Sequence, residues 1–130
     1  MSTKFWRYED RIDPDSDDAF TPSEMDMIVG MVRESSFRDD ESGHSIEERM
    51  VDFFEDCDPS WVGFQSQDGT CYVNCFGVLR NDDETVARLE LQFELADDLE
   101  SFTLSGMLVD DREQDETVIM DFEERIAGGD

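Results

Sequence analysis

Residues 85–95 alternate between apolar and polar side chains, and this alternation constrains the fold more than any other feature of the sequence. The segment reads TVARLELQFEL, so one set of alternate positions is apolar (Leu89, Leu91, Phe93 and Leu95) and the other is polar (Arg88, Glu90, Gln92 and Glu94). Successive side chains of a β-strand point to opposite faces of the sheet. The segment therefore predicts a strand with one face buried in a core and the other in water.

Two further segments resemble neighbours of this strand, residues 71–79 before it and residues 102–109 after it. The links between them are short and polar, which is typical of tight turns; they lie at Asn81-Asp82-Asp83 and Ala96-Asp97-Asp98. Parallel strands need much longer crossover connections, so these links exclude them. We expect residues 61–110 to form an antiparallel meander of three or four strands.

The N-terminal half carries two helix-start signals. Thr21 with Glu24, and Ser45 with Glu48, have the spacing of a capping box, in which the N-cap residue and the third helical residue exchange hydrogen bonds. Apolar residues then recur at helical spacing after each box. We expect two helices within a helical part that spans residues 21–58, and their periodicity ends near Arg33 and Cys57.

The last segment, residues 115–127, fits two periods. Val118, Met120 and Phe122 occupy alternate positions as in a strand, whereas Ile119, Phe122 and Ile126 have helical spacing. The glycine pair that follows is typical of a helix stop and favours a helix.

Together these patterns predict an α+β fold in a single domain, residues 1–130. Its parts are an irregular acidic arm at residues 1–20, two helices, the antiparallel meander and a C-terminal helix. We expect the helices to cover one face of the sheet and the charged side chains of the other face to meet water.

The chain carries 36 Asp and Glu residues against 10 Lys and Arg residues, a formal net charge of −26 at pH 7. The acidic residues are spread over both halves and are interrupted throughout by large apolar residues, which indicates a folded acidic surface and not a disordered tail. Such a surface repels anionic membranes and bare nucleic acid and attracts basic proteins. The sequence shows neither a membrane-length apolar run nor a signal-peptide core, so we expect a cytoplasmic location.

Residues 13–24 read DPDSDDAFTPSE, and their spacing resembles the calcium-binding loop of the EF-hand family. The resemblance rests on carboxylates at the first, third, fifth and twelfth places of the loop (Asp13, Asp15, Asp17 and Glu24). It implies that these four side chains bind calcium. Asp18 stands where the family has glycine, and the alternative interpretation is a solvated loop that leads into a capped helix.

Residues that carry catalytic or metal chemistry in other proteins lack suitable partners here. Cys71 and Cys75 lie four residues apart in a predicted strand, which separates them by about 13 Å and excludes a disulfide or a shared metal. His44 is the only histidine, and the second predicted helix separates it from Cys57 by about 20 Å. Adjacent carboxylates occur at many places, so none is singled out for acid–base catalysis. We therefore predict a protein that is not an enzyme and holds no cofactor other than the calcium weighed above.

The net charge has the scale of a nucleic acid. A duplex as long as a 130-residue domain is wide, about 36 Å, carries about 21 phosphate charges. We therefore expect a protein that inhibits a basic nucleic-acid-binding partner, either as a DNA mimic of the antirestriction or anti-CRISPR type or as an immunity protein to a nuclease toxin. The candidate contacts are acidic residues at the predicted turns and two aromatic residues (Asp82, Asp83, Glu84, Asp97, Asp98, Glu100, Asp110, Asp111, Trp61 and Phe64).

Salt adaptation is the alternative explanation of the charge. Lys4 is the only lysine, whereas arginine is retained, and a cytoplasm rich in potassium salts favours this balance. In that case the acidic side chains serve solvation and carry no information about a partner. A single EF-hand-like calcium-binding domain is the remaining alternative.

Overall fold

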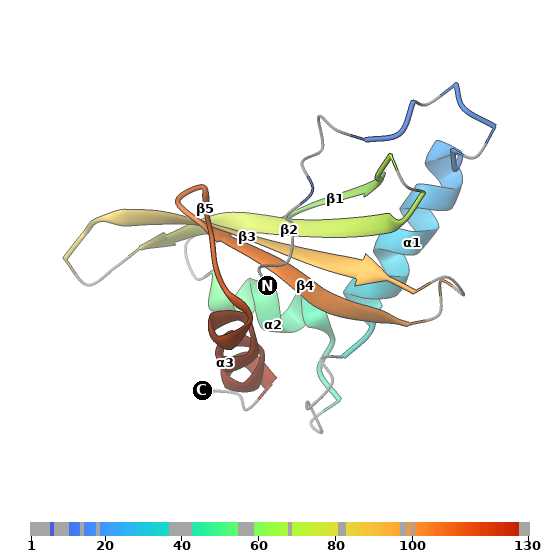
Figure 1. Cartoon of the computed structure of the whole chain (residues 1–130). Coiled ribbons are helices and arrows are strands. Elements are labelled where there is room, and N and C mark those ends of the chain that lie inside the picture. The colour runs from blue at the N-terminus through green and yellow to red at the C-terminus, as the bar shows by residue number, and fades with distance from the viewer. Residues whose placement is uncertain are drawn as a thin grey trace.

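The computed structural model describes residue 6 and residues 11–13, 15–17, 19–36, 43–54, 59–67, 69–80, 83–96, 99 and 101–127, with the backbone alone at 79, 80, 126 and 127. Two helices come first, five strands follow, and a third helix ends the described chain (Figure 1). The elements are α1 Pro22–Glu34, α2 Ile46–Phe53, β1 Ser60–Gln65, β2 Cys71–Arg80, β3 Val86–Leu95, β4 Phe102–Val109, β5 Arg112–Glu113 and α3 Glu116–Ala127.

The strands form one antiparallel sheet in the order β1-β2-β3-β4-β5, so each strand pairs with its neighbours in sequence. This arrangement confirms the predicted meander and the α+β class. Strands β2, β3 and β4 lie where the alternation placed them, and β1 supplies the fourth strand. The sequence analysis did not predict β5, because two residues are too few to establish a period.

Both capping boxes are formed as predicted. The N–H of Glu24 donates to Thr21 Oγ1 at 3.2 Å and the N–H of Thr21 donates to Glu24 Oε1 at 3.0 Å. Ser45 and Glu48 exchange the same pair of hydrogen bonds at 3.1 and 3.2 Å. Helix α2 ends at Phe53, earlier than the predicted end near Cys57, and residues 55–58 lie outside the described chain. Helix α3 confirms the helical interpretation of the last segment.

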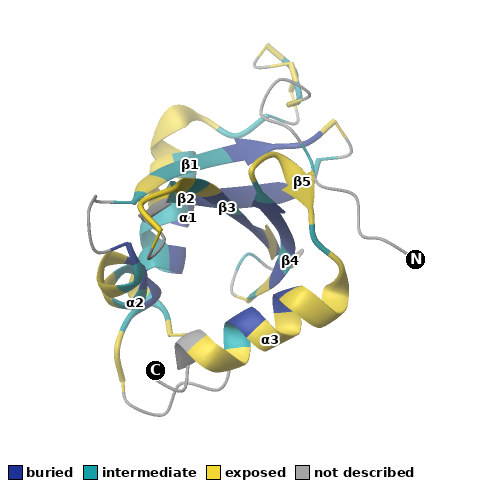
Figure 2. Ribbon diagram, turned by 90° about the vertical axis from the view of Figure 1, so that its left-hand side faces the viewer, coloured by how far each residue is buried: buried dark blue, intermediate teal, exposed yellow. Residues whose placement is uncertain are grey.

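The core lies between the sheet and the three helices. The apolar face of β3 forms its floor, and the predicted positions Leu89, Leu91, Phe93 and Leu95 are all buried. The three helices, with the C-cap residue of α2, contribute apolar residues to the same core cluster (Ile28 and Val32; Ile46, Met50 and Phe54; Ile119 and Phe122). Figure 2 shows buried segments on the sheet and helices where they face one another, with exposed segments on the outer side of α3.

Glycine at one position allows α1 to lie close to the edge strand β1. A Cβ atom at Gly63 would lie 2.6 Å from Val29 Cγ2, a separation that side-chain carbons do not adopt. The bare backbone of β1 therefore provides the surface on which this turn of α1 packs.

The second face of the sheet is partly buried, and this corrects the expectation that its polar residues all meet water. Gln92 is fully buried, and its amide is bonded on both sides to the backbone of Trp6: Oε1 accepts the Trp6 N–H at 3.0 Å, and Nε2 donates to the Trp6 carbonyl at 2.8 Å. Gln92 Nε2 also donates to Asn74 Oδ1 at 3.0 Å. The Trp6 ring lies 6.4 Å from that of Tyr72, between centroids. The arm therefore covers this face at Trp6.

We predict that Gln92 is a major determinant of stability. Replacing it with leucine removes the partner of two backbone groups of Trp6 and of Asn74 Oδ1, and the free energy of unfolding should fall by about 2–4 kcal/mol. Urea denaturation followed by circular dichroism measures this change. Trp6→Phe is the matched control, because it keeps the backbone hydrogen bonds and an aromatic ring at this position, so it should cost no more than about 1.5 kcal/mol. Equal losses in the two variants would contradict this account.

Candidate functional site

Every Asp and Glu side chain that the structure describes is exposed or half-buried. The buried polar residues among the described ones are amides and a hydroxyl (Gln65, Ser66, Asn74 and Gln92). Burial of a carboxylate costs free energy unless the group is paired, so the chain places its charge on the surface and builds its core without it.

The predicted acidic turns lie at opposite ends of the sheet. In an antiparallel meander the β2–β3 and β4–β5 connections lie at one end and the β3–β4 connection lies at the other. Figure 1 shows the β2–β3 hairpin projecting beyond the rest of the sheet at the first end. We call this first end, with Asp83, Glu84, Asp110 and Asp111, the turn end. Asp82, Asp97, Asp98 and Glu100 lie outside the described residues.

Asp83 is held in its charged form at the turn end. The Thr85 hydroxyl donates to Asp83 Oδ1 at 2.6 Å, and the Thr85 N–H donates to the same oxygen at 3.1 Å. These hydrogen bonds, from the side chain and then from the backbone, lower the pKa of Asp83 below its usual range. The carboxylate therefore stays negative to a lower pH than an isolated aspartate.

Asp110 and Asp111 form the two-residue turn between β4 and β5, and both have positive φ, at 53° and 68°. This conformation suits Asn-Gly and Asp-Gly, and it strains residues with a side chain. Asp110 has a local role, because its Oδ1 accepts the N–H of Arg88 at 2.9 Å and its own N–H donates to the Arg88 carbonyl at 2.8 Å. The exposed carboxylate of Asp111 has no such hydrogen bond to β3.

The two predicted aromatic contacts lie elsewhere. Phe64 is buried, 3% exposed, and stacks on Tyr72 at 5.6 Å between centroids, so its prediction as an exposed contact is wrong. Phe64 lies on the face of the sheet opposite the helices, which we call the uncovered face, with Tyr72 as its cross-strand partner. Trp61 lies on the helix side, half-buried, with the Arg33 guanidinium carbon 5.7 Å from its ring centroid.

Phe76 on β2 is an exposed aromatic residue near the turn end that was not predicted as a contact. Cross-strand partners share a face of the sheet, and the register gives one row of such partners across all five strands (Ser60, Phe76, Glu90, Leu108 and Glu113). The next row toward the hairpin pairs Val78 with Arg88. Alternation in β2 could have identified Phe76 and Val78 as residues of the uncovered face.

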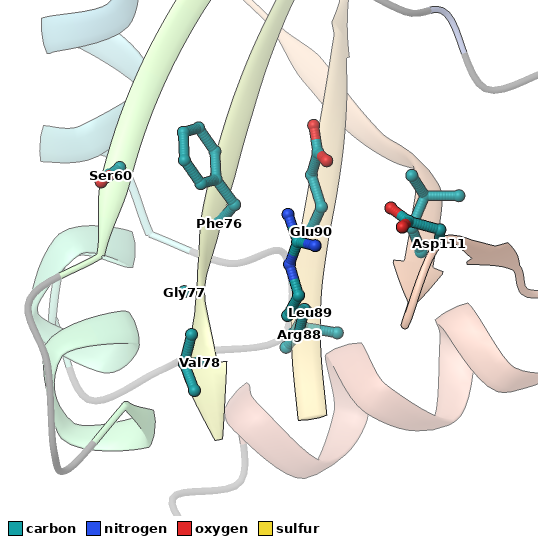
Figure 3. A pocket seen from close by; sticks show the side chains of 9 residues that line it. Ser60, Phe76, Gly77, Val78, Arg88, Leu89, Glu90 and Asp111 are labelled. Carbon is teal, nitrogen blue, oxygen red and sulfur yellow. The ribbon is translucent and has the colours of Figure 1, made fainter. Parts of the chain in front are cut away.

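These two rows surround a hollow on the uncovered face of the sheet, with a volume of about 320 Å³ (Figure 3). We call it the sheet hollow. Phe76 and Val78 are 38% and 41% exposed, whereas Leu108 is buried at 2%. The lining residues are Ser60, Phe76, Gly77, Val78, Arg88, Leu89, Glu90, Leu108 and Asp111. An apolar floor with charged groups around it suits an amphipathic segment of a partner.

The hydrogen bonds of the buried amides extend to this hollow. Asn74 Nδ2 donates to Glu90 Oε2 at 2.8 Å, and Asn74 Oδ1 accepts from Gln92, which is held by the Trp6 backbone. The Glu90 carboxylate is therefore oriented by a connected chain of amides and not by a mobile contact with water.

The EF-hand-like residues are not assembled into a metal site in this structure. Asp13 Oδ1 accepts the N–H of Asp15 at 2.9 Å, as in a turn stabilised by an aspartate side chain, and Glu24 is bound to Thr21 in the capping box. Among the residues that the structure describes, no three His, Cys, Asp or Glu side chains gather closely enough to hold a metal ion. Asp17 is exposed in the same loop.

The thiols of β2 lie in the core. Cys71 and Cys75 are buried and unlinked, as the strand spacing predicts. Burial raises the pKa of the Cys71 thiol to about 11 and that of Cys75 further still, so both are unreactive at neutral pH. His44 is exposed before α2, and Cys57 lies outside the described residues.

None of the described helices is long and apolar enough to cross a bilayer. Comparison of the chain with protein-family models, with curated proteins and with solved structures finds no match in any of the three.

We predict that Asp111→Gly stabilises the protein. Glycine adopts positive φ without strain, and one negative charge is removed from a crowded surface, so the free energy of unfolding should rise by about 0.5–1 kcal/mol. Asp110→Gly is the control, because it relieves the same strain but loses the hydrogen bond to Arg88. Urea denaturation of both variants checks this, and a loss of stability in Asp111→Gly would contradict it.

We predict that the two core thiols resist alkylation in the folded protein. With a pKa near 11, Cys71 holds about a hundredfold less thiolate at pH 8 than a thiol of pKa 9, and burial limits access as well. Peptide mapping after iodoacetamide treatment should find Cys71 and Cys75 unmodified in buffer and modified in urea. Rapid labelling of either residue in buffer would show that β2 opens locally.

Proposed function

We propose that this protein is a non-enzymatic acidic binding protein that neutralises a basic nucleic-acid-binding partner. It does so either by mimicking nucleic acid or as an immunity protein to a nuclease toxin. The observation that carries the proposal is the display of charge: a net −26, with every described carboxylate at the surface. Solubility needs far less charge than this, and self-repulsion opposes folding, so a basic partner gives the charge a role.

The arrangement of the turn end supports the same proposal. Asp111 is exposed there and lines the sheet hollow, Asp83 and Glu84 are exposed in the β2–β3 hairpin at the same end, and protein interfaces commonly combine apolar groups with a charged rim. Such a surface attracts a basic groove at a distance and adds contact area when the two surfaces meet.

A pull-down from host lysate on immobilised protein tests the proposal. We expect it to retain a basic nucleic-acid-binding protein, with less retained as salt rises and with release by added duplex DNA. Recovery of neutral or acidic proteins alone would contradict the proposal.

Two charge variants make the test specific to a surface. The first removes three charges at the turn end, Asp83→Asn, Glu84→Gln and Asp111→Asn. The second removes three from the exposed sides of α1 and α2, Asp26→Asn, Glu34→Gln and Asp52→Asn. Only the first variant should retain clearly less partner.

Circular dichroism at low salt distinguishes partner binding from salt adaptation. A protein whose acidity serves a salt-rich cytoplasm should lose structure when salt is removed, because repulsion between its carboxylates is then unscreened. The proposed binding protein should stay folded there.

A further inference from the structure

We propose that the sheet hollow is the docking site for an aromatic side chain of the basic partner, carried on a segment with arginine or lysine on either side of it. This inference rests on the proposed function and names the contact that the partner makes. It follows from the position of the hollow, the charges around it and the nature of its floor (Figure 3).

The hollow lies on the face of the sheet that Trp6 contacts, at a distance from that contact along the strands. Trp6 is fixed over Gln92 and Tyr72, whose rows lie farther from the turn end than the row of Phe76 and Glu90. Beyond that contact, Phe76 and Val78 are 38% and 41% exposed. This patch, unlike the covered part, keeps its apolar groups available to a partner.

The charges around the hollow determine which occupant fits. Glu90 and Asp111 line it, Asp110 lies beside Asp111, and Glu113 follows on β5. A second copy of this chain would bring another net −26 against these groups, and nucleic acid would be repelled in the same way. A basic protein segment is the occupant whose charge complements the rim.

The floor of the hollow favours an aromatic residue at the centre of that segment. Phe76 offers a ring and Val78 offers aliphatic surface, with Leu108 buried beneath them, and the volume of about 320 Å³ holds one large side chain. Arg88 stands at the same hollow and provides a cation for the face of an incoming ring. Buried aromatic anchors also supply much of the free energy of binding in protein interfaces.

The Glu90 carboxylate is already oriented to accept a cation that flanks the aromatic residue of the partner. Its Oε2 accepts from Asn74, so the carboxylate stays in one orientation before the partner arrives. A preoriented acceptor loses less conformational entropy on binding than a free side chain. Asn74 and Gln92 are thus positioning residues that act through Glu90.

Two labelled nine-residue peptides test the proposal, an arginine-rich peptide with tryptophan at its centre and the same peptide with serine there. Fluorescence anisotropy on the intact protein should show the tryptophan peptide binding about tenfold more tightly than the serine peptide. Both affinities should fall as salt rises.

Matched variants locate the anchor. Val78→Thr replaces a methyl group with a hydroxyl at constant shape, and it should reduce the preference for tryptophan to about threefold or less. Val51→Thr on α2 is the control, because Val51 is 42% exposed against 41% for Val78, and it should keep the preference. Phe76→Ser should abolish the preference.

Asp111→Gly distinguishes a loss of binding from a loss of folding. The same variant should raise the stability of the protein and yet bind both peptides more weakly, by about two- to fivefold, because one rim charge is lost. Asp52→Asn on α2 should leave both affinities nearly unchanged.

The two proposals fail in different ways. Salt-dependent binding of both peptides with equal affinity, or a preference for tryptophan that survives Phe76→Ser, would overturn the docking site and leave the proposed function standing. Absence of salt-dependent binding of either peptide would overturn the proposed function as well.

Discussion

Burial of the apolar side of β3 is the contact on which the rest of the structure depends. This strand pairs on both sides, and its buried apolar residues (Leu89, Leu91, Phe93 and Leu95) belong to the core cluster to which all three helices contribute. A chain with a net charge of −26 repels itself at every degree of compaction, so the core has to supply the opposing free energy. It does so with an apolar interior from which every described carboxylate is absent.

The other side of the same strand carries residues on which the proposed binding surface is built. Gln92 forms hydrogen bonds with the backbone of Trp6, which lies over part of this face, and with Asn74. Asn74 in turn donates to Glu90, so one connected set of hydrogen bonds extends from the covered part of the face to the hollow. The open part lies next to the turn end, where exposed carboxylates gather. Stability and the candidate binding surface are therefore coupled through a single residue of the central strand.

The turn formed by Asp110 and Asp111 places two carboxylates at the surface in a strained backbone conformation. Asn-Gly would form this turn without strain, yet the chain has two aspartates at positive φ. The hydrogen bond that the Asp110 carboxylate accepts from the Arg88 N–H offsets part of the backbone strain at Asp110. Asp111, also at positive φ, places a carboxylate at the rim of the hollow, where the proposed docking site requires a negative charge.

The sequence by itself determined the elements whose signals are local. Alternation identified β2, β3 and β4, and the two capping boxes placed the first turns of α1 and α2, because these patterns follow from backbone geometry. The tertiary structure decided what covers each face. Phe64 is buried against Tyr72 and Gln92 is covered by Trp6, whereas Phe76 on the same face is 38% exposed, and a contact between residues 86 positions apart leaves no local signal.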